Sequence, residues 1–136
     1  MQLYCYILVI LLQLQLYWFN PLKDWSLKMN ELISRDELKT MINSGAQHKL
    51  VEALPKKYFE TEHLPKAINI PHDEIVSIAP ILLPNKSEPV IVYCANAQCQ
   101  NSHMAAESLR ELGYTKVYEY REGKKDWIEA GLQIEK

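Results

Sequence analysis

The chain is not enriched in glycine, proline, basic residues or cysteine, and each of these enrichments is typical of a particular class of protein. Only four residues are Gly and seven are Pro, which excludes a collagen-like repeat and low-complexity disorder. Lys and Arg number 15 against 17 Asp and Glu, so no basic excess exists to neutralise phosphates, and nucleic acid is not an expected partner. Three cysteines (Cys5, Cys94 and Cys99) are too few for a disulfide scaffold. The 136 residues, 48% of them hydrophobic, suit one domain with a real core.

A long apolar run opens the chain. Every residue from 3 to 19 is apolar except Gln13 and Gln15. As a helix, this segment would span roughly 25 Å, which is a marginal bilayer crossing. Three interpretations stay open: a membrane anchor, a helix packed on the domain, and an upstream extension that is not natively translated. In the first interpretation, Lys23 and Lys28 favour a cytoplasmic location for everything after the anchor.

Met29 begins a segment that would stand alone as a complete domain, so we divide the chain into residues 1–28 and a functional domain at 29–136. In the domain, Ser34 to Glu37 form a capping box that opens a helix, and Gly45 is a natural left-handed end for it. Apolar patterning predicts the remaining elements: strands over 49–54, 67–70, 90–93 and 116–120, and helices over 57–62, 73–83 (interrupted by Pro80), 102–112 and 124–130. This alternation predicts an α/β fold with a parallel central sheet flanked by helices.

Cys94 is the chemical candidate, because it ends the most hydrophobic predicted strand, 90–93. Sites in open parallel sheets form at the carboxyl ends of strands. A short loop and a helix follow, and such a turn can direct backbone N–H groups and the helix dipole at the sulfur. A free thiol of pKa 8.5 is about 3% ionised at neutral pH, and a pKa of about 7 would make it roughly half ionised. The alternative is a buried structural cysteine.

The sequence resembles the rhodanese-like domain family over roughly residues 32–134. The resemblance is carried by six segments in the family's order and spacing: Leu50-Val51-Glu52-Ala53-Leu54, His63-Leu64-Pro65-Lys66-Ala67-Ile68-Asn69-Ile70-Pro71, Val92-Tyr93-Cys94, Ser102-His103-Met104-Ala105-Ala106, Leu112-Gly113-Tyr114 with Val117-Tyr118-Glu119-Tyr120, and Asp126-Trp127-Ile128-Glu129-Ala130-Gly131-Leu132. Each segment alone is weak evidence, whereas the complete set in this order is specific.

The resemblance implies a sulfurtransferase whose catalytic residue is Cys94. In this family the cysteine takes sulfane sulfur from thiosulfate or a persulfide and passes it to a thiol or cyanide by covalent catalysis. The expected partners are small sulfur donors, thiol acceptors and a protein that carries a persulfide, with membrane association through residues 3–19 in the anchor interpretation. No metal or organic cofactor is implied. The loop amides are expected to bind the anionic sulfur of the substrate, and the residues concerned are Ala95, Asn96, Ala97, Gln98, Cys99 and Gln100.

Several positions depart from the family pattern. Glu62 and Lys66 stand where glycines are usual, and Glu52 and Leu54 replace a common Asp and Arg whose loss puts the rigidity of the site in doubt. The loop has no Arg or Lys, which predicts poor affinity for doubly charged thiosulfate and a preference for donors of lower charge. The same absence argues against the phosphatase relatives of the fold, which clamp phosphate with an arginine.

Residues beyond the loop are expected to have ordinary roles. His63 is predicted to be structural, Trp127 to be in the core, and His103 to be exposed on the first helical turn. Lys124 and Lys125 have the pattern of a solvated face, with the alternative that they or Arg121 attract anions to the site.

Because of Cys99, a redox-active dithiol stays open as an alternative to a sulfurtransferase. Five residues from Cys94, it is able to resolve a sulfenate or persulfide as an internal disulfide, which would make the domain a redox-active dithiol. The plainer interpretation is a half-buried loop residue. A third hypothesis is a non-catalytic rhodanese-type binding module, against which the intact Cys94 argues.

Overall fold

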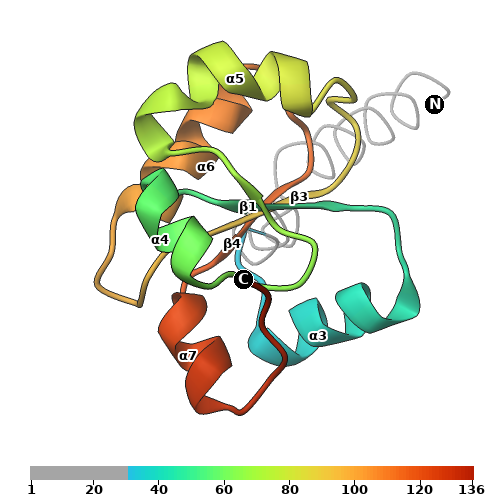
Figure 1. Cartoon of the computed structure of the whole chain (residues 1–136). Coiled ribbons are helices and arrows are strands. Elements are labelled where there is room, and N and C mark those ends of the chain that lie inside the picture. The colour runs from blue at the N-terminus through green and yellow to red at the C-terminus, as the bar shows by residue number, and fades with distance from the viewer. Residues whose placement is uncertain (1–30) are drawn as a thin grey trace, which may run out of the picture. The chain divides into compact units, whose positions relative to one another are not determined.

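The computed structural model describes residues 31–136, whose centre is a four-stranded sheet (Figure 1). The spatial order is β2-β1-β3-β4, and every neighbouring pair is parallel. The strands are β1 (Lys49–Glu52), β2 (Ile68–Asn69), β3 (Val90–Tyr93) and β4 (Val117–Tyr120). All four residues of β3 are buried, because this strand lies inside the sheet and helices cover both of its faces. The predicted α/β fold with a parallel central sheet is therefore confirmed.

Helices form a layer on each face of the sheet (Figure 1). The first layer holds α5 (Ile75–Leu82) and α6 (Asn101–Glu111), with the short 3-10 helix η1 (His72–Glu74) leading into α5. The second layer holds α3 (Arg35–Ser44), α4 (Lys56–Thr61) and α7 (Gly123–Glu129). Each helix connects two parallel strands or flanks the sheet at an end of the domain, as expected for an alternating sequence.

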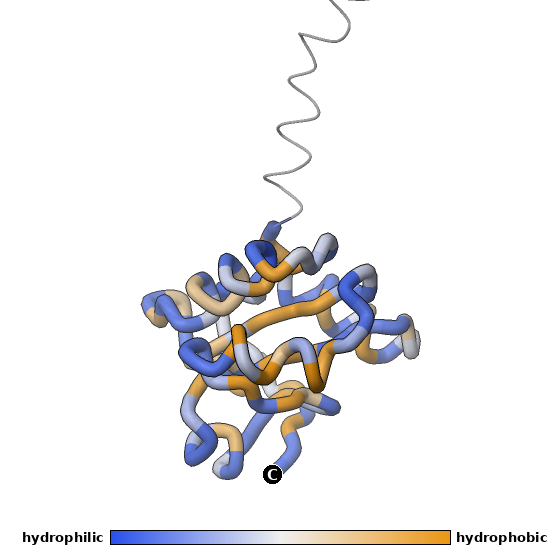
Figure 2. The backbone as a smooth tube through the Cα atoms, turned by 90° about the horizontal axis from the view of Figure 1, so that it is seen from above, coloured by the Kyte–Doolittle hydropathy of each residue, from blue (hydrophilic) through white to orange (hydrophobic). Residues whose placement is uncertain are grey.

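The sheet separates two hydrophobic cores. Val51, Val92 and Leu109 belong to the core under α5 and α6, whereas Leu50, Tyr93 and Trp127 belong to the core on the opposite face. Neighbouring strand residues point to opposite faces, so Leu50 and Val51 fall in different cores. Figure 2 shows hydrophobic residues concentrated in the segments that cross the middle of the domain. Trp127 is buried, which confirms its predicted place in the core.

The ends of α3 are those that the sequence predicts. The Ser34 side chain accepts a hydrogen bond from the Glu37 amide, and the Glu37 carboxylate accepts one from the Ser34 amide. Gly45 ends the helix with φ at 71°, in the left-handed region.

The prediction that Pro80 interrupts the helix over residues 73–83 is wrong, because α5 runs through this residue. Proline removes one N–H donor from the second turn, and the helix nevertheless continues to Leu82.

Residues 3–19, and the expectations of a membrane anchor and of membrane association attached to them, lie outside the described residues. Within residues 31–136, no helix is both long enough and apolar enough to cross a membrane.

Candidate active site around Cys94

Cys94 follows β3 directly and is fully buried. Its carbonyl accepts a hydrogen bond from the Lys124 amide at the start of α7, over 2.8 Å. The neighbouring Ala95 carbonyl accepts one from the Lys125 amide, over 2.9 Å. The end of β3 is thus fixed by the first turn of α7, which holds the cysteine in a defined position at the carboxyl edge of the sheet.

The Cys94 side chain has two hydrogen-bond acceptors within reach. It donates to the Ser102 hydroxyl over 3.3 Å and to the Cys99 carbonyl over 3.4 Å. The pKa of Cys94 is raised to about 11, because burial and the contact with the Cys99 side chain raise it more than the hydrogen bonds of the Ser102 hydroxyl and amide lower it. The expected lowering of this pKa by the loop is not found, because a carbonyl and a buried environment both disfavour the anion.

Asn96 organises the loop after Cys94. Its side-chain oxygen accepts hydrogen bonds from the amides of Gln98 and Cys99, each over 3.1 Å. The Asn96 carbonyl also accepts from the Cys99 amide, over 3.2 Å. Two amides that were expected to face the sulfur are therefore engaged within the loop itself. This turn chemistry is typical of Asn.

A cavity of about 330 Å³ opens beside the loop. Three of the predicted substrate-binding residues line it, namely Ala97, Cys99 and Gln100. Cys94 is not among the lining residues, whereas Cys99 is partly exposed there. The thiol that a molecule in this cavity meets first is therefore that of Cys99, and a reagent reaches Cys94 only when the loop moves.

The other residues lining this cavity come from α6 and from the end of β4. They are His103, Glu119 and Arg121. His103 has about 45% of its side chain exposed, as predicted, but its Nδ1 also lies 3.5 Å from the Glu119 carboxylate. Sequence reasoning missed Glu119. The available signal was a charged residue in the otherwise apolar strand Val117–Tyr120.

Glu119 connects to Cys94 through a single residue. Its Oε1 accepts a hydrogen bond from the Ser102 hydroxyl over 3.1 Å, and Ser102 in turn accepts from the Cys94 thiol. Both Ser102 and Glu119 are buried, so these hydrogen bonds form in a protein environment of low dielectric constant. The site therefore contains a thiol, a hydroxyl and a carboxylate in series.

Gly123 allows α7 to approach the loop. Its φ of 76° is in the left-handed region, and a Cβ placed there would meet the Cys94 carbonyl oxygen and the Asn96 amide nitrogen at 2.8 Å. No side chain fits in this space, so glycine is required both by conformation and by contact.

Comparison with known proteins identifies the family. The Rhodanese-like domain family matches residues 34–130, and the thiosulfate sulfurtransferase PspE of Escherichia coli K12 is 42% identical over 73 residues, which are 54% of this chain and 67% of that one. The chain belongs to the rhodanese-like domain family. Its fold matches the BH2092 protein of Bacillus halodurans with a TM-score of 0.77 at 24% identity, covering 85% of this chain and 86% of that one.

A second relative is much longer than this chain and matches it over only part of its length. The adenylyltransferase and sulfurtransferase UBA4 of Meyerozyma guilliermondii is 31% identical over 108 residues, which are 74% of this chain. The matched part is 24% of UBA4, so the chain spans about a quarter of that relative.

Two departures from the rhodanese pattern have different structural outcomes. Lys66 replaces a usual glycine and has φ at 62°, a left-handed conformation that costs a non-glycine residue roughly 1–2 kcal/mol. Glu62 replaces the other glycine with φ at −169°, which is extended backbone open to any residue. His63 fills its predicted structural role, stacking on Phe59 and contacting the Phe59 carbonyl through Nδ1.

Glu52, which replaces the usual rhodanese Asp, forms a buried ion pair with Lys124. Glu52 is fully buried, and Lys124 also donates to the carbonyls of Tyr58 and Glu62, over 3.1 and 2.8 Å. The interpretation of Lys124 as part of a solvated face is therefore wrong, since its stem and ammonium are enclosed by β1 and α4. Lys125 is exposed, as expected. Lys124 therefore connects α7 to β1 and to α4.

Proposed function

We propose that this domain is a sulfurtransferase of the rhodanese type, in which Cys94 accepts sulfane sulfur and passes it on. The observation that supports the proposal most directly is the position of Cys94. It is a free cysteine at the carboxyl end of the central strand, followed by a loop and a helix, in a chain that shares 42% identity with a thiosulfate sulfurtransferase over 73 residues.

The reaction has two steps that balance without a cofactor. The Cys94 thiolate attacks the outer sulfur of thiosulfate or of a persulfide, a new S–S bond forms, and sulfite or a thiolate leaves. The Cys94 persulfide is then attacked at its outer sulfur by cyanide or by a thiol, which carries that sulfur away and restores the thiolate. This is covalent catalysis by an activated nucleophile. Within residues 31–136, no cluster of three or more metal-binding side chains is present.

The charge around the cavity favours donors of low charge. Arg121 and His103 face it, but Arg121 Nε lies 3.8 Å from Glu119, which offsets its positive charge. The loop itself brings no Lys or Arg. A persulfide donor, small or carried by a protein, therefore fits better than the thiosulfate dianion, because the charge of Arg121 is offset by Glu119.

Intact mass spectrometry of the full chain tests the proposal, with Cys5→Ser in every protein so that Cys94 and Cys99 are the thiols that can react. Incubation with thiosulfate or polysulfide should add one sulfur atom, about 32 Da, and excess cyanide should remove it with formation of thiocyanate. Cys94→Ala should add no cyanide-labile sulfur, whereas Cys99→Ser should still take up one atom. Uptake from polysulfide should be faster than from thiosulfate at equal concentration. Failure of the native chain to gain sulfur from either donor would contradict the proposal.

A second candidate function is a redox-active dithiol formed by Cys94 and Cys99. The observation that favours it is their proximity, because the Cys94 thiol bonds the Cys99 carbonyl and an ionised Cys99 raises the pKa of Cys94. Under a two-electron oxidant such as peroxide, a Cys94–Cys99 disulfide would form with the loss of two hydrogens, about 2 Da. That loss, together with no sulfur uptake in the test above, would favour the dithiol over the sulfurtransferase.

A further inference from the structure

The Cys94 sulfur is separated from the cavity that a substrate can enter. Cys94 is fully buried and does not line the cavity of about 330 Å³ beside the loop, whereas Cys99 is partly exposed in the wall of that cavity. Of the two hydrogen-bond partners of the Cys94 sulfur, Cys99 lines the cavity and Ser102 does not. Cys99 therefore stands between the buried sulfur and the space from which an acceptor approaches.

The two cysteines contact each other directly. The Cys94 sulfur lies 3.4 Å from the Cys99 carbonyl oxygen, and the two side chains are also within hydrogen-bonding range of each other. Both are free cysteines. A persulfide on Cys94 lengthens this side chain by one S–S bond of about 2 Å. Because Sγ of Cys94 faces Cys99 and Ser102, the added sulfur lies beside these two residues.

Asn96 fixes the backbone of Cys99 in this position. The Cys99 amide donates to the Asn96 side-chain oxygen over 3.1 Å and to the Asn96 carbonyl over 3.2 Å. The Cys99 carbonyl accepts from the Cys94 thiol, so both backbone polar groups of residue 99 are bound within the site. Two reacting groups held next to each other in this way react as one molecule, without the entropy loss of an encounter.

We propose that Cys99 is a second sulfur carrier of this site, which takes the outer sulfur from the Cys94 persulfide and delivers it to the acceptor in the cavity. This inference rests on the proposed function and adds a second catalytic residue to it. Cys94 receives sulfur from the donor when the loop opens. Cys99 then passes the sulfur on with the loop closed, so that the acceptor needs no second opening.

The transfer between the two cysteines balances without an oxidant or a reductant. The Cys99 thiolate attacks the outer sulfur of the neutral Cys94 persulfide, and a new S–S bond forms at Cys99. The S–S bond at Cys94 breaks, its electron pair stays on the Cys94 thiolate, and the persulfide proton stays on the transferred sulfur. A thiolate or cyanide then attacks that sulfur. It leaves as the acceptor persulfide, or as thiocyanate with release of the proton, and Cys99 is again a thiolate.

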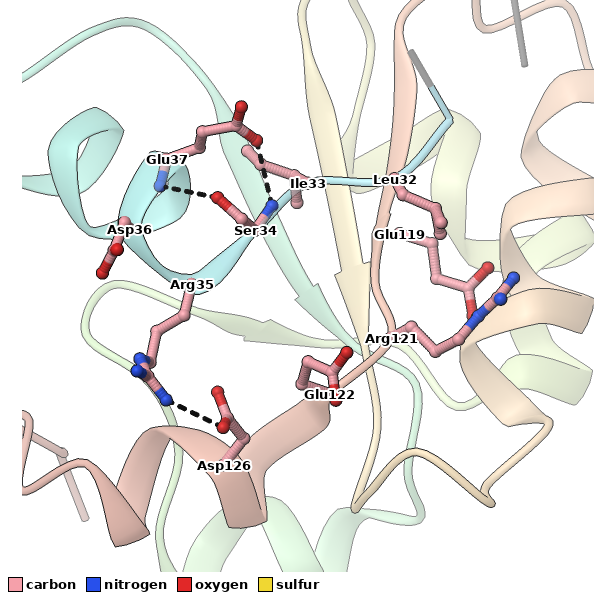
Figure 3. Close-up of a pocket in the computed structure, with 10 residues that line it drawn as sticks. All are labelled: Leu32, Ile33, Ser34, Arg35, Asp36, Glu37, Glu119, Arg121, Glu122 and Asp126. Carbon is pink, nitrogen blue, oxygen red and sulfur yellow. Dashed lines mark hydrogen bonds and ion pairs between the residues drawn. The ribbon is translucent and has the colours of Figure 1, made fainter. Parts of the chain in front are cut away.

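A larger cavity nearby gives the sulfur no other exit. Glu119 and Arg121, which line the cavity of Cys99, also line a second cavity of about 550 Å³ (Figure 3). Figure 3 shows the side chains of these two residues next to each other. None of the residues that line the second cavity is a cysteine. Cyanide needs only the smaller cavity, whereas a larger thiol has the second cavity within reach for its remaining atoms.

Timed trapping of the persulfide tests whether sulfur reaches Cys99. The full chain with Cys5→Ser is loaded from polysulfide, freed of the donor and capped with iodoacetamide at intervals, and peptide fragment masses then assign the sulfur to Cys94 or Cys99. Sulfur should be found on Cys94 first and on Cys99 later. In Cys94→Ala, Cys99 should stay free of sulfur, because Cys94 is its source. Loading of Cys99 in Cys94→Ala as fast as in the chain that keeps Cys94 would overturn the proposal.

Release of the sulfur separates a carrier from a merely structural residue. Cys99→Ser should take up one sulfur at the same rate as the chain with Cys99, but its release to cyanide or a thiol should slow by about tenfold or more, because the acceptor then depends on the small population with an open loop. A structural role would slow uptake and release alike. The matched control is Cys5→Ser against the unaltered chain, the same substitution at a cysteine outside residues 31–136, and both rates should stay the same.

The outcomes distinguish this inference from the proposed function. No sulfur on either cysteine would mean that the proposed function fails, and the transfer to Cys99 with it. Sulfur confined to Cys94, with equal release in Cys99→Ser and in the chain with Cys99, would overturn the transfer and leave the proposed function standing. Loss of two hydrogens with release of sulfide after loading would place the attack of Cys99 at the inner sulfur, which also overturns the transfer and favours the dithiol.

Discussion

Two buried carboxylates in this domain stand in opposite situations. Glu52 is fully buried at the end of β1, and its partner is the Lys124 ammonium, itself enclosed by backbone carbonyls. Glu119 is buried in β4, but its contacts are divided among Ser102, His103 and Arg121, and it lines two cavities. One carboxylate is enclosed by a fixed charge partner, and the other is connected to both the thiol and the solvent.

The difference lies in how each buried charge is compensated. Glu52 has one close partner, Lys124, whose ammonium also donates to two backbone carbonyls, so removal of that partner leaves an uncompensated buried charge. The Glu119 carboxylate shares its contacts among Ser102, His103 and Arg121, each longer than 3 Å. Substitutions of the partners of Glu52 should therefore lower stability more than substitutions of the partners of Glu119.

The largest expected effect on stability is that of Lys124→Met. It leaves Glu52 buried without its charge partner, which should lower the free energy of unfolding by about 3–5 kcal/mol. Urea unfolding of the full chain, followed by far-ultraviolet circular dichroism, measures this. Lys125→Met is the matched control, because that neighbouring lysine is exposed and 4.0 Å from Glu129, and it should cost under about 1 kcal/mol. Equal losses in the two variants would contradict the structural role of the pair.

An intermediate effect is expected from pH. Burial raises the pKa of Glu52 above its ordinary value of 4.5, against the opposing hydrogen bond and charge of Lys124. The folded state therefore holds this proton to higher pH than the unfolded chain does. The stability contributed by that proton is fully present below pH 4.5 and is lost as the pH rises through the folded pKa.

The double variant Glu52→Gln with Lys124→Met removes this titration and is the reference for the measurement. The free energy of unfolding of the native chain, minus that of the double variant, should be larger at pH 4 than at pH 7. Urea titrations at both values give the difference. A difference that stays constant, or that grows toward pH 7, would show that the pKa of Glu52 is not raised by folding.

The smallest effect on stability is expected from Arg121→Met. The Arg121 side chain is about half exposed and its Nε is 3.8 Å from Glu119, so the loss should be within about 1 kcal/mol. The same urea titration measures it. A loss as large as that of Lys124→Met would mean that Glu119, like Glu52, depends on a single fixed charge, and the contrast between the two carboxylates would fail.

Local rules were sufficient for most of the fold. The capping box at Ser34 and the end at Gly45 are encoded within a few residues, and the strand Val90–Tyr93 is apolar throughout because both of its faces are covered. The rule for Pro80 was too strict, since α5 continues to Leu82 although this proline supplies no N–H donor. Family resemblance supplied Cys94 as the catalytic residue, which remains a prediction.

The parts that the sequence did not reveal depend on contacts between distant segments. Lys124 is 72 residues from Glu52, and nothing in the local pattern distinguishes it from the exposed Lys125. Glu119 reaches Ser102 across 17 residues, and the direction of their hydrogen bond exists only in the folded chain. The raised pKa of Cys94 has the same origin, because burial of the thiol is a property of the assembled domain.

The attachment of α7 to the end of β3 has a consequence for the motions of the site. The amides of Lys124 and Lys125 hold the carbonyls of Cys94 and Ala95, and Gly123 brings the backbones together. Any opening that exposes Cys94 by moving residue 94 itself would have to unravel the first turn of α7. The hydrogen bonds of residues 96–99 lie within the loop, apart from the contact of the Cys99 carbonyl with the Cys94 sulfur. Movement of this loop segment therefore requires fewer broken contacts than movement of Cys94 and leaves α7 folded.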